Sequence, residues 1–147
     1  MRLSFQPPKL LDAYPFAHAI RVRFAETDAM GIVHHASYLP YLEEARVAYL
    51  RAIDHPYTRV REEDGIDFTV IEAYCRYEQP LRFDDVVDVH VILGSLTRTT
   101  FQLGYLLSIE GERRATAVTV HGCVTPTGRP VRVPGWMHDF AAAAVPS

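Results

Sequence analysis

The chain has 147 residues, a length that fits one domain and leaves little room for a second. Hydrophobic residues make up 48% of it and charged residues 22%, the balance of a globular protein with a real core rather than of a disordered chain. The net charge of −3 gives no overall basic field for nucleic acid, and no apolar stretch approaches the length of a membrane span.

Hydrophobic periodicity predicts one strand and then a long helix in the first third of the chain. Residues 1–17 read as an irregular lead-in broken by prolines. Apolar residues alternate with arginines over 18–24, the pattern of a half-buried strand. Residues 37–53 follow the helical period, with Ser37 as the expected N-cap and Pro40 in the first turn. Glu43 and Arg46, three residues apart, predict an ion pair on the surface of this helix.

The rest of the chain predicts strands. Residues 59–64 form a charged, solvated connection, and strand patterns then cover 68–77, 86–96, 99–110 and 114–125. The short turns between them favour antiparallel neighbours. The order of one strand, one long helix and four strands predicts an α+β fold in which an antiparallel sheet packs on one helix. The domain is expected over 18–134, between a lead-in at 1–17 and a tail at 135–147 that can hold a short helix.

Cysteine usage and the N-terminal sequence favour a cytoplasmic protein. Cys75 and Cys123 lie in apolar strand patterns without a CxxC motif, which predicts reduced core thiols. The first residues have no apolar segment of the kind that a secretory signal needs.

Residues 27–37 combine the elements of an acyl-transfer site. Asp28 lies in a loop after a strand, Gly31 permits a tight turn, and a helix begins a few residues later. The free amides at a helix N-terminus, here near His35, can stabilise an oxyanion, and a carboxylate can attack a carbonyl or activate water. A loop aspartate before a helix is also typical of a cap or a turn, so the pattern alone leaves both interpretations open.

The segment TDAMGIVHHASYLPYLEEAR, residues 27–46, resembles the active-site segment of the 4-hydroxybenzoyl-CoA thioesterase family, and within it the acyl-CoA thioesterases associated with the Tol-Pal cluster. The matching positions are Thr27, Asp28, Gly31, His35, Tyr38, Glu43 and Arg46. The resemblance implies a hotdog fold, in which a curved antiparallel sheet of about five strands wraps a long central helix. It also implies hydrolysis of a fatty or aromatic acyl-CoA without a metal or redox cofactor, by a homodimer or homotetramer with sites at the subunit interface.

The same resemblance implies a role for each matching residue. Asp28 would be the nucleophile or the general base, and the His35 amide would polarise the thioester carbonyl, with its side chain lining the pocket. Gly31 would let the acyl carbonyl approach, and Tyr38 would lie beside the acyl chain. Two departures are Ser37, where several relatives carry Asn, and the bulky Ala29-Met30 pair, which bears on acyl preference.

The phosphates of CoA need donors, which the family places around the later strands. Arg98, flanked by Thr97 and Thr99, is the expected binding site, with Arg82 and Arg129 as weaker candidates. The alternative interpretation of Arg98 is a solvated turn residue.

Other polar residues have simpler interpretations. His34 and His35 are adjacent on one backbone and are not expected to bind a metal, which needs three or four converging ligands. His90 and His121 lie in strand patterns and are expected to be satisfied core or interface residues. Two rival functions stay open: a hotdog hydratase or dehydratase that uses His35 with Asp28, and a non-catalytic module that binds acyl-CoA. The sequence leaves acyl length and the choice between CoA and acyl carrier protein undecided.

Overall fold

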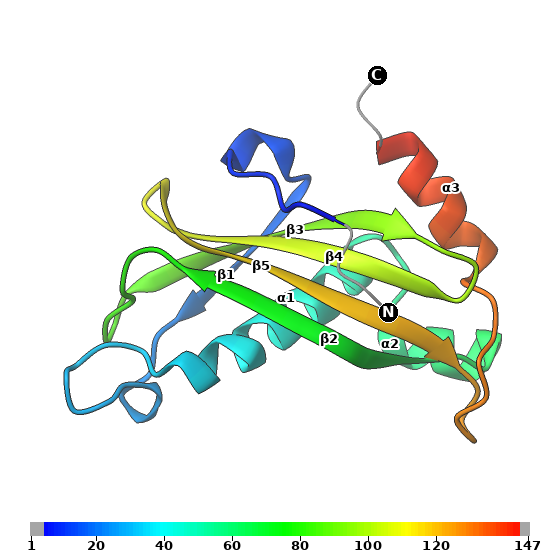
Figure 1. The fold of residues 1–147 in the computed structure, drawn as a ribbon, viewed down its shortest axis with the longest axis horizontal. Coiled ribbons are helices and arrows are strands. Elements are labelled where there is room, and N and C mark those ends of the chain that lie inside the picture. Colours follow the sequence, from blue (N-terminus) through cyan, green and yellow to red (C-terminus); the bar gives the residue numbers. More distant parts are fainter. Residues whose placement is uncertain (1–4, 145–147) are drawn as a thin grey trace.

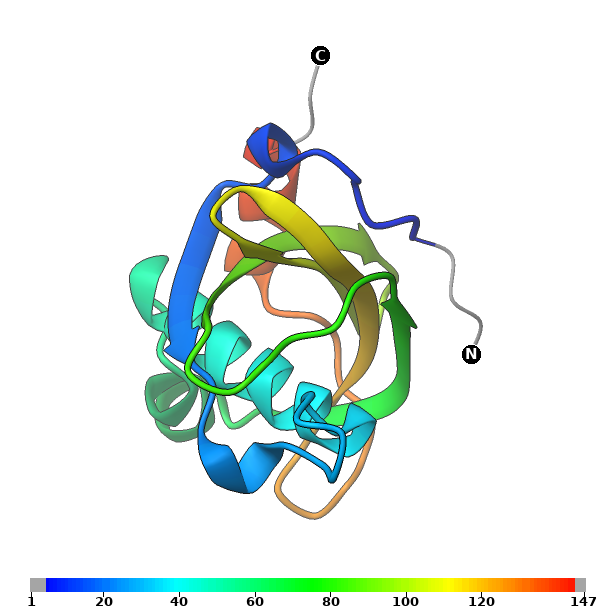
Figure 2. The same cartoon turned by 90° about the vertical axis from the view of Figure 1, so that its left-hand side faces the viewer.

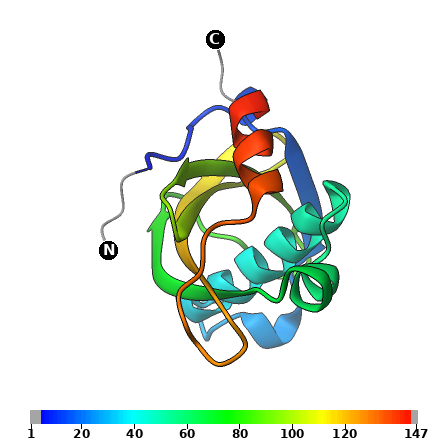
Figure 3. The same ribbon diagram turned by 90° about the vertical axis from the view of Figure 1, so that its right-hand side faces the viewer.

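The computed structural model describes residues 5–144 and contains one antiparallel sheet of five strands in the order β1-β3-β4-β5-β2 (Figure 1). The strands are β1 Phe16–Arg21, β2 Asp67–Tyr77, β3 Val86–Leu96, β4 Thr100–Ile109 and β5 Glu112–Val124. Figures 2 and 3 show the sheet curving round helix α1, Tyr38–Ala52. The predicted α+β architecture of five strands round a long helix is therefore confirmed, with strand bounds that differ from the predicted ones by at most three residues.

Helix α1 is the centre of the core. Its buried residues recur at helical spacing: Tyr38, Tyr41, Leu42, Ala45, Ala48, Tyr49 and Leu50. They meet the inward side chains of β3, which alternate along the strand as Val87, Val89, Val91 and Leu93. Burying such side chains stabilises the fold by about 1.5–3 kcal/mol each, so this contact surface fixes the position of α1 within the sheet.

The start of α1 differs from the prediction in its capping. Ser37 precedes the helix as expected, but its hydroxyl donates to the Glu26 carbonyl oxygen, 3.4 Å away, and does not cap α1. A 3-10 turn, His35–Ser37, leads into the helix instead. Its cap is the His34 ring, whose Nδ1 accepts from the Ala36 amide at 3.1 Å. The helix entrance is thus built by the loop that carries Asp28.

The outer face of the sheet is covered by the N-terminal segment. The Phe5 ring lies against Gly94 and Gly104, where an added Cβ would stand 2.6 and 2.5 Å from its atoms. The Phe5 amide donates to the buried Gln102 side chain at 3.1 Å. Further along the segment, the Lys9 carbonyl accepts from Arg113. From Phe5 onward, the predicted irregular lead-in is therefore a packed part of the fold, and this packing explains why β4 is buried on both faces.

Short helices pack near the C-terminal end of α1. Helix α2, Tyr57–Arg59, continues into a π-helical turn at Val60–Asp64, and helix α3, Gly135–Ala144, lies in the predicted tail. The Trp136 ring of α3 stacks on His55 with centroids 3.8 Å apart, and its Nε1 donates to Asp64. Within the described residues, no helix has the length and apolar character needed to cross a membrane.

Candidate active site

Asp28 begins a tight turn between β1 and α1. Its Oδ1 accepts from the Met30 amide at 2.8 Å, and its backbone exchanges hydrogen bonds with Gly31 and Ile32. Gly31 has φ +79°, a left-handed conformation that a side chain disfavours. The turn therefore requires glycine at this position, as predicted, and it holds the Asp28 carboxylate with one oxygen engaged.

Glu26 joins this turn to the helix and was not singled out by the sequence. Its backbone oxygen accepts from the His34 amide at 2.8 Å, and its carboxylate accepts from the Tyr41 hydroxyl at 2.6 Å. Arg23 donates to the same carboxylate from its backbone and its side chain. Burial alone would raise the pKa of Glu26, but the hydrogen bonds from Tyr41 and Arg23 outweigh it and hold the pKa below its ordinary value. The sequence did not mark Glu26 as a site residue, because Tyr41 approaches it only in the folded chain.

The first amide of the helical segment is free. Ala36 and Ser37 donate their N–H groups to His34, but within the described part of the chain nothing accepts from the His35 N–H. The His35 ring is exposed and stacks on the His34 ring, with centroids 4.3 Å apart. The segment thus offers one unpaired backbone donor beside the Asp28 turn, at the positive end of α1.

Asp28 and His35 line one open cavity of about 410 Å³. The other residues around it are Ile32, Val33, Tyr38, Tyr77, Glu78, Gln79 and Pro80. The Tyr38 side chain is buried, with its ring edge-on to Tyr77, and burial raises the pKa of its hydroxyl to about 12. A phenol with this pKa stays neutral at physiological pH. Three of the predicted site residues, Asp28, His35 and Tyr38, are therefore brought together, with Gly31 in the adjoining turn.

The Thr97–Thr99 turn lies at the opposite end of the sheet. It follows β3, which begins near the Asp28 loop and extends for 11 residues, a length of about 36 Å. The Thr97 hydroxyl accepts a hydrogen bond from the Thr100 amide, and the Arg98 side chain is exposed. One subunit therefore does not bring Arg98 to the Asp28 cavity. Arg82 is closer in the fold, because its backbone pairs with Ile32 of the Asp28 turn.

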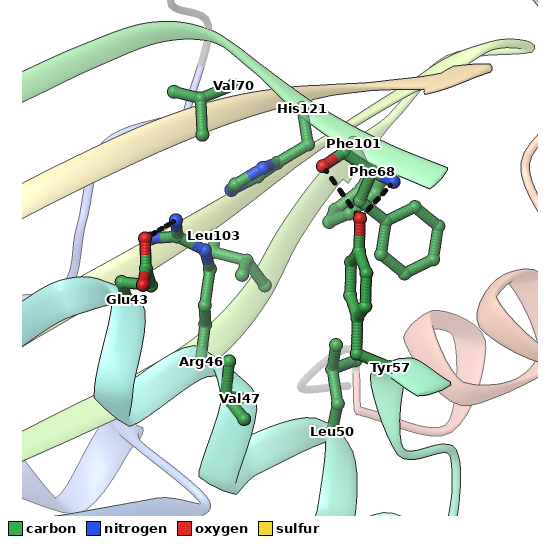
Figure 4. Close-up of a pocket in the computed structure, with 10 residues that line it drawn as sticks. All are labelled: Glu43, Arg46, Val47, Leu50, Tyr57, Phe68, Val70, Phe101, Leu103 and His121. Atoms are coloured by element: carbon green, nitrogen blue, oxygen red, sulfur yellow. Dashed lines mark hydrogen bonds and ion pairs between the residues drawn. The ribbon is translucent and has the colours of Figure 1, made fainter. Parts of the chain in front are cut away.

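A second cavity, of about 330 Å³, lies between α1 and the sheet (Figure 4). Arg46 and His121 are polar groups on a largely apolar wall. The His121 ring bonds Thr119 at 2.7 Å, and Thr119 bonds the Tyr105 hydroxyl at 2.6 Å. Burial, and then the charge of Arg46, lower the pKa of His121 to about 3, so the ring is neutral. His121 is thus a satisfied core histidine, as predicted, and His90 likewise bonds Ser108.

Comparison with known proteins identifies the family. The family model of the thioesterase-like superfamily matches residues 22–143 of the chain. The chain belongs to the thioesterase-like superfamily. A protein of Aquifex aeolicus that is provisionally named an esterase is 43% identical over 120 residues, which cover 82% of this chain and 92% of that one. The 1,4-dihydroxy-2-naphthoyl-CoA hydrolase of Thermosynechococcus vestitus is 32% identical over 122 residues, which cover 79% of this chain and 84% of that one.

A solved thioesterase has the same arrangement of elements. The structure of a Thermus thermophilus thioesterase, described as complexed with coenzyme A and Zn, matches with a TM-score of 0.76 and 28% identity, over 90% of this chain and 96% of that one. Together with the family match, this identifies the sheet and central helix as a hotdog fold.

Proposed function

We propose that the protein is an acyl-CoA thioesterase in which Asp28 supplies the attack on the thioester carbonyl. The observation that carries the proposal is the meeting of a loop carboxylate and an unpaired helix N-terminal amide, that of His35, in one cavity. An acyl-transfer site needs both groups within reach of one carbonyl, the carboxylate at its carbon and the amide at its oxygen. The names of relatives that hydrolyse or bind CoA compounds support CoA as the carrier.

Two routes of attack fit the position of Asp28. In the first, a carboxylate oxygen bonds to the thioester carbon, the C–S bond breaks, and water then hydrolyses the mixed anhydride. In the second, Asp28 takes a proton from water while the hydroxide adds to the carbon, and the proton passes to the departing thiolate. Both give a free acid and CoA, and neither needs a metal or redox cofactor.

The oxyanion formed in either route requires a donor. The His35 N–H is free for it, and the dipole of α1 favours negative charge there. A single donor of this kind contributes about 10²–10³ in rate. The Tyr38 ring would border the acyl group, and the turn at Gly31 would leave its carbonyl room to approach. Membership of the Tol-Pal-associated branch is the finer form of this proposal, with a cytoplasmic location that suits two free cysteines.

The proposal includes a homodimer formed through β2. Among the described strands, only β5 is a neighbour of β2, so the other edge of β2 is open over 11 residues. Its exposed side chains include Val70, Ile71, Tyr74 and Tyr77. A long apolar edge invites pairing with a second strand, and a two-fold axis would make the two β2 strands antiparallel. Tyr77 of β2 also lines the Asp28 cavity, so the cavity would lie at this interface.

Antiparallel pairing also offers a place for the predicted phosphate donors. The Thr99 carbonyl accepts from the Cys123 amide, and Cys123 pairs with Phe68 at the start of β2. In the dimer, that end of one subunit would lie beside the Tyr77 end of the other. Thr97, Arg98 and Thr99 would then approach the partner's Asp28 cavity, where one subunit alone does not bring them. Two such dimers would stack to form the homotetramer that the family resemblance implies.

The test is thiol release from a panel of short, long and aromatic acyl-CoAs, with hydration of an enoyl-CoA measured in parallel. Release of CoA from at least one thioester supports the proposal. Tight binding of the same compounds with no release would favour the acyl-CoA-binding module, and addition of water to the enoyl-CoA would favour the hydratase.

A further inference from the structure

Glu72 and Arg76 are charged side chains of β2 that have no ion-pair partner among the described residues. The neighbouring strand β5 places only the apolar Val120 beside Glu72 and the uncharged Thr116 beside Arg76. Glu72 is half-buried, and its Oε2 is shielded from solvent and accepts no hydrogen bond within the described part of the chain. A half-buried carboxylate without a donor is costly, so a cation supplied from outside the subunit would stabilise it.

Other charged side chains near the sheet already have partners. The Glu78 carboxylate interacts electrostatically with Arg76, but it accepts two hydrogen bonds from Arg113, at 2.8 and 2.9 Å. The predicted pair of Glu43 and Arg46 also forms, with 3.8 Å between nitrogen and oxygen, although Arg46 is only 17% exposed and lines the second cavity instead of the helix surface. The two unpaired charges of β2 therefore stand out on its exposed edge.

The open edge of β2 presents the backbone of every second residue (Figure 1). The Glu78 amide donates to β5 at 3.0 Å, so the alternation along the strand directs the N–H and C=O groups of Ala73, Cys75 and Tyr77 away from β5. A second β2 strand could bond to these groups. Tyr74 lies between two of them and would form a non-hydrogen-bonded pair, the type in which opposite side chains are closest.

A two-fold axis at Tyr74 pairs the two charges reciprocally. Two antiparallel β2 strands that meet there place Glu72 of each subunit opposite Arg76 of the other, because both residues are two positions from the axis. An axis one residue earlier would leave both charges unpaired, and an axis one residue later would set Glu72 opposite Glu78. Opposite charges across a strand pair stabilise it and like charges destabilise it, so the charges favour the axis at Tyr74.

We propose that two copies of this chain pair through β2 with Tyr74 on the two-fold axis and a Glu72–Arg76 ion pair on each side of it. The partner is a second copy of the chain, because an acid, an aromatic residue and a base at equal spacing are complementary to themselves under two-fold symmetry. Tyr74 is 48% exposed and would cover its own copy across the axis. The inference rests on the homodimer in the proposed function and gives its register.

This register also places a partner side chain beside the Asp28 cavity. Ala73 and Val70 line hollows between β2 and α1, and Tyr77 lines the Asp28 cavity, so all three face inward. With the axis at Tyr74, Ala73 of the partner subunit would lie opposite the residue after Tyr74. Val70 of the partner subunit, the next inward residue, would then stand beside Tyr77 and border the acyl site.

The first experiment measures the dimer dissociation constant of charge-reversed variants by sedimentation. Glu72→Arg alone and Arg76→Glu alone each set like charges opposite one another, so each should raise the constant by about 10- to 100-fold. The double variant restores opposite charges without changing the net charge and should return the constant to near the wild-type value. Asp12→Arg changes the net charge as much as Glu72→Arg does, but beside β1 at the other edge of the sheet, and is the matched control.

A cysteine on the axis tests the register directly. In a Cys75→Ser background, Tyr74→Cys would place two Cα atoms about 4.5 Å apart across the axis, which is within disulfide range. Oxidation should then give a covalent dimer on a non-reducing gel. Arg76→Cys in the same background is the control, because its two copies would lie about 13 Å apart and should not cross-link.

Each result has a definite meaning. Cross-linking of Arg76→Cys but not of Tyr74→Cys, or a double charge reversal that dimerises no better than the single variants, would overturn the register while leaving a dimer through β2 in place. A monomeric wild type would overturn the dimer and the register together. Neither measurement depends on CoA release, so failure of the proposed hydrolysis would be seen separately.

Discussion

Replacing Glu26 with alanine should weaken both the fold and the site. The Glu26 carboxylate accepts from the Tyr41 hydroxyl at 2.6 Å and from the Arg23 backbone at 2.8 Å. Tyr41 is 2% exposed, so its hydroxyl would be left buried without this partner. Such an orphaned group costs about 1–3 kcal/mol. Arg23 is largely exposed, and water would replace its contacts with Glu26. The loss of these contacts should therefore change the free energy of unfolding little.

A loss of about 2 kcal/mol corresponds to a fall in Tm of about 4–8 °C for a chain of this size. The pH dependence follows from the pKa of Glu26, which is lower in the folded protein than in the unfolded chain. The ionised carboxylate therefore contributes stability above its unfolded pKa, about 4.3, and this contribution is lost as the pH falls through the folded pKa. The charge of Glu26 accounts for part of the difference in unfolding free energy between wild type and Glu26→Ala. This part should be fully present at pH 7 and should shrink below about pH 4.

The assay is urea unfolding at pH 7 and pH 3.5, with kcat measured at pH 7. Because the Glu26 carboxylate ties the loop that carries Asp28 to Tyr41 of α1, its loss should shift that loop against the start of the helix, and kcat should fall by up to about 10²-fold, the effect of a 1 Å misplacement. Glu112→Ala removes an exposed glutamate paired with Arg114 and serves as the control. Wild-type stability and wild-type kcat in Glu26→Ala would refute the reasoning.

Three further changes test other parts of the structure. Gly31→Ala forces a side chain into φ +79° and should cost about 1–2 kcal/mol in urea unfolding, with reduced kcat; an unaffected variant would show that the turn does not need glycine. Gly104→Val should displace the Phe5 ring and speed cleavage by a lysine-specific protease at Lys9, the only lysine; an unchanged cleavage rate would contradict the packing of the N-terminal segment. Tyr74→Lys places a charge on the open edge of β2 and should convert a dimer to a monomer in light scattering; a persistent dimer would place the interface elsewhere.

The periodic parts of the fold could be predicted because their signals are local. Strand β3 and helix α1 each bury one face in step with their own period, so the apolar pattern in the sequence identifies them. The turn at Asp28 was also readable, because it needs a left-handed glycine three residues later.

What escaped prediction depends on contacts between distant residues. The lead-in showed no periodicity, yet Phe5 packs on the outer face because Gly94 and Gly104, about ninety or more residues later, leave room for its ring. Arg46 occupies a position that the helical pattern assigns to the surface, but the curvature of the sheet carries Val70 over it. Whether Arg98 belongs to the site depends on a second subunit, which no local pattern can supply.

The most direct test of the central claim is CoA release by wild type and by Asp28→Asn on the best acyl-CoA of the panel. The variant keeps the size of the side chain and an oxygen that can accept from the Met30 amide, so it should fold and bind the substrate. The account predicts a fall in kcat of about 10³-fold or more with little change in substrate binding. A folded Asp28→Asn variant that hydrolyses the thioester at the wild-type rate would contradict it.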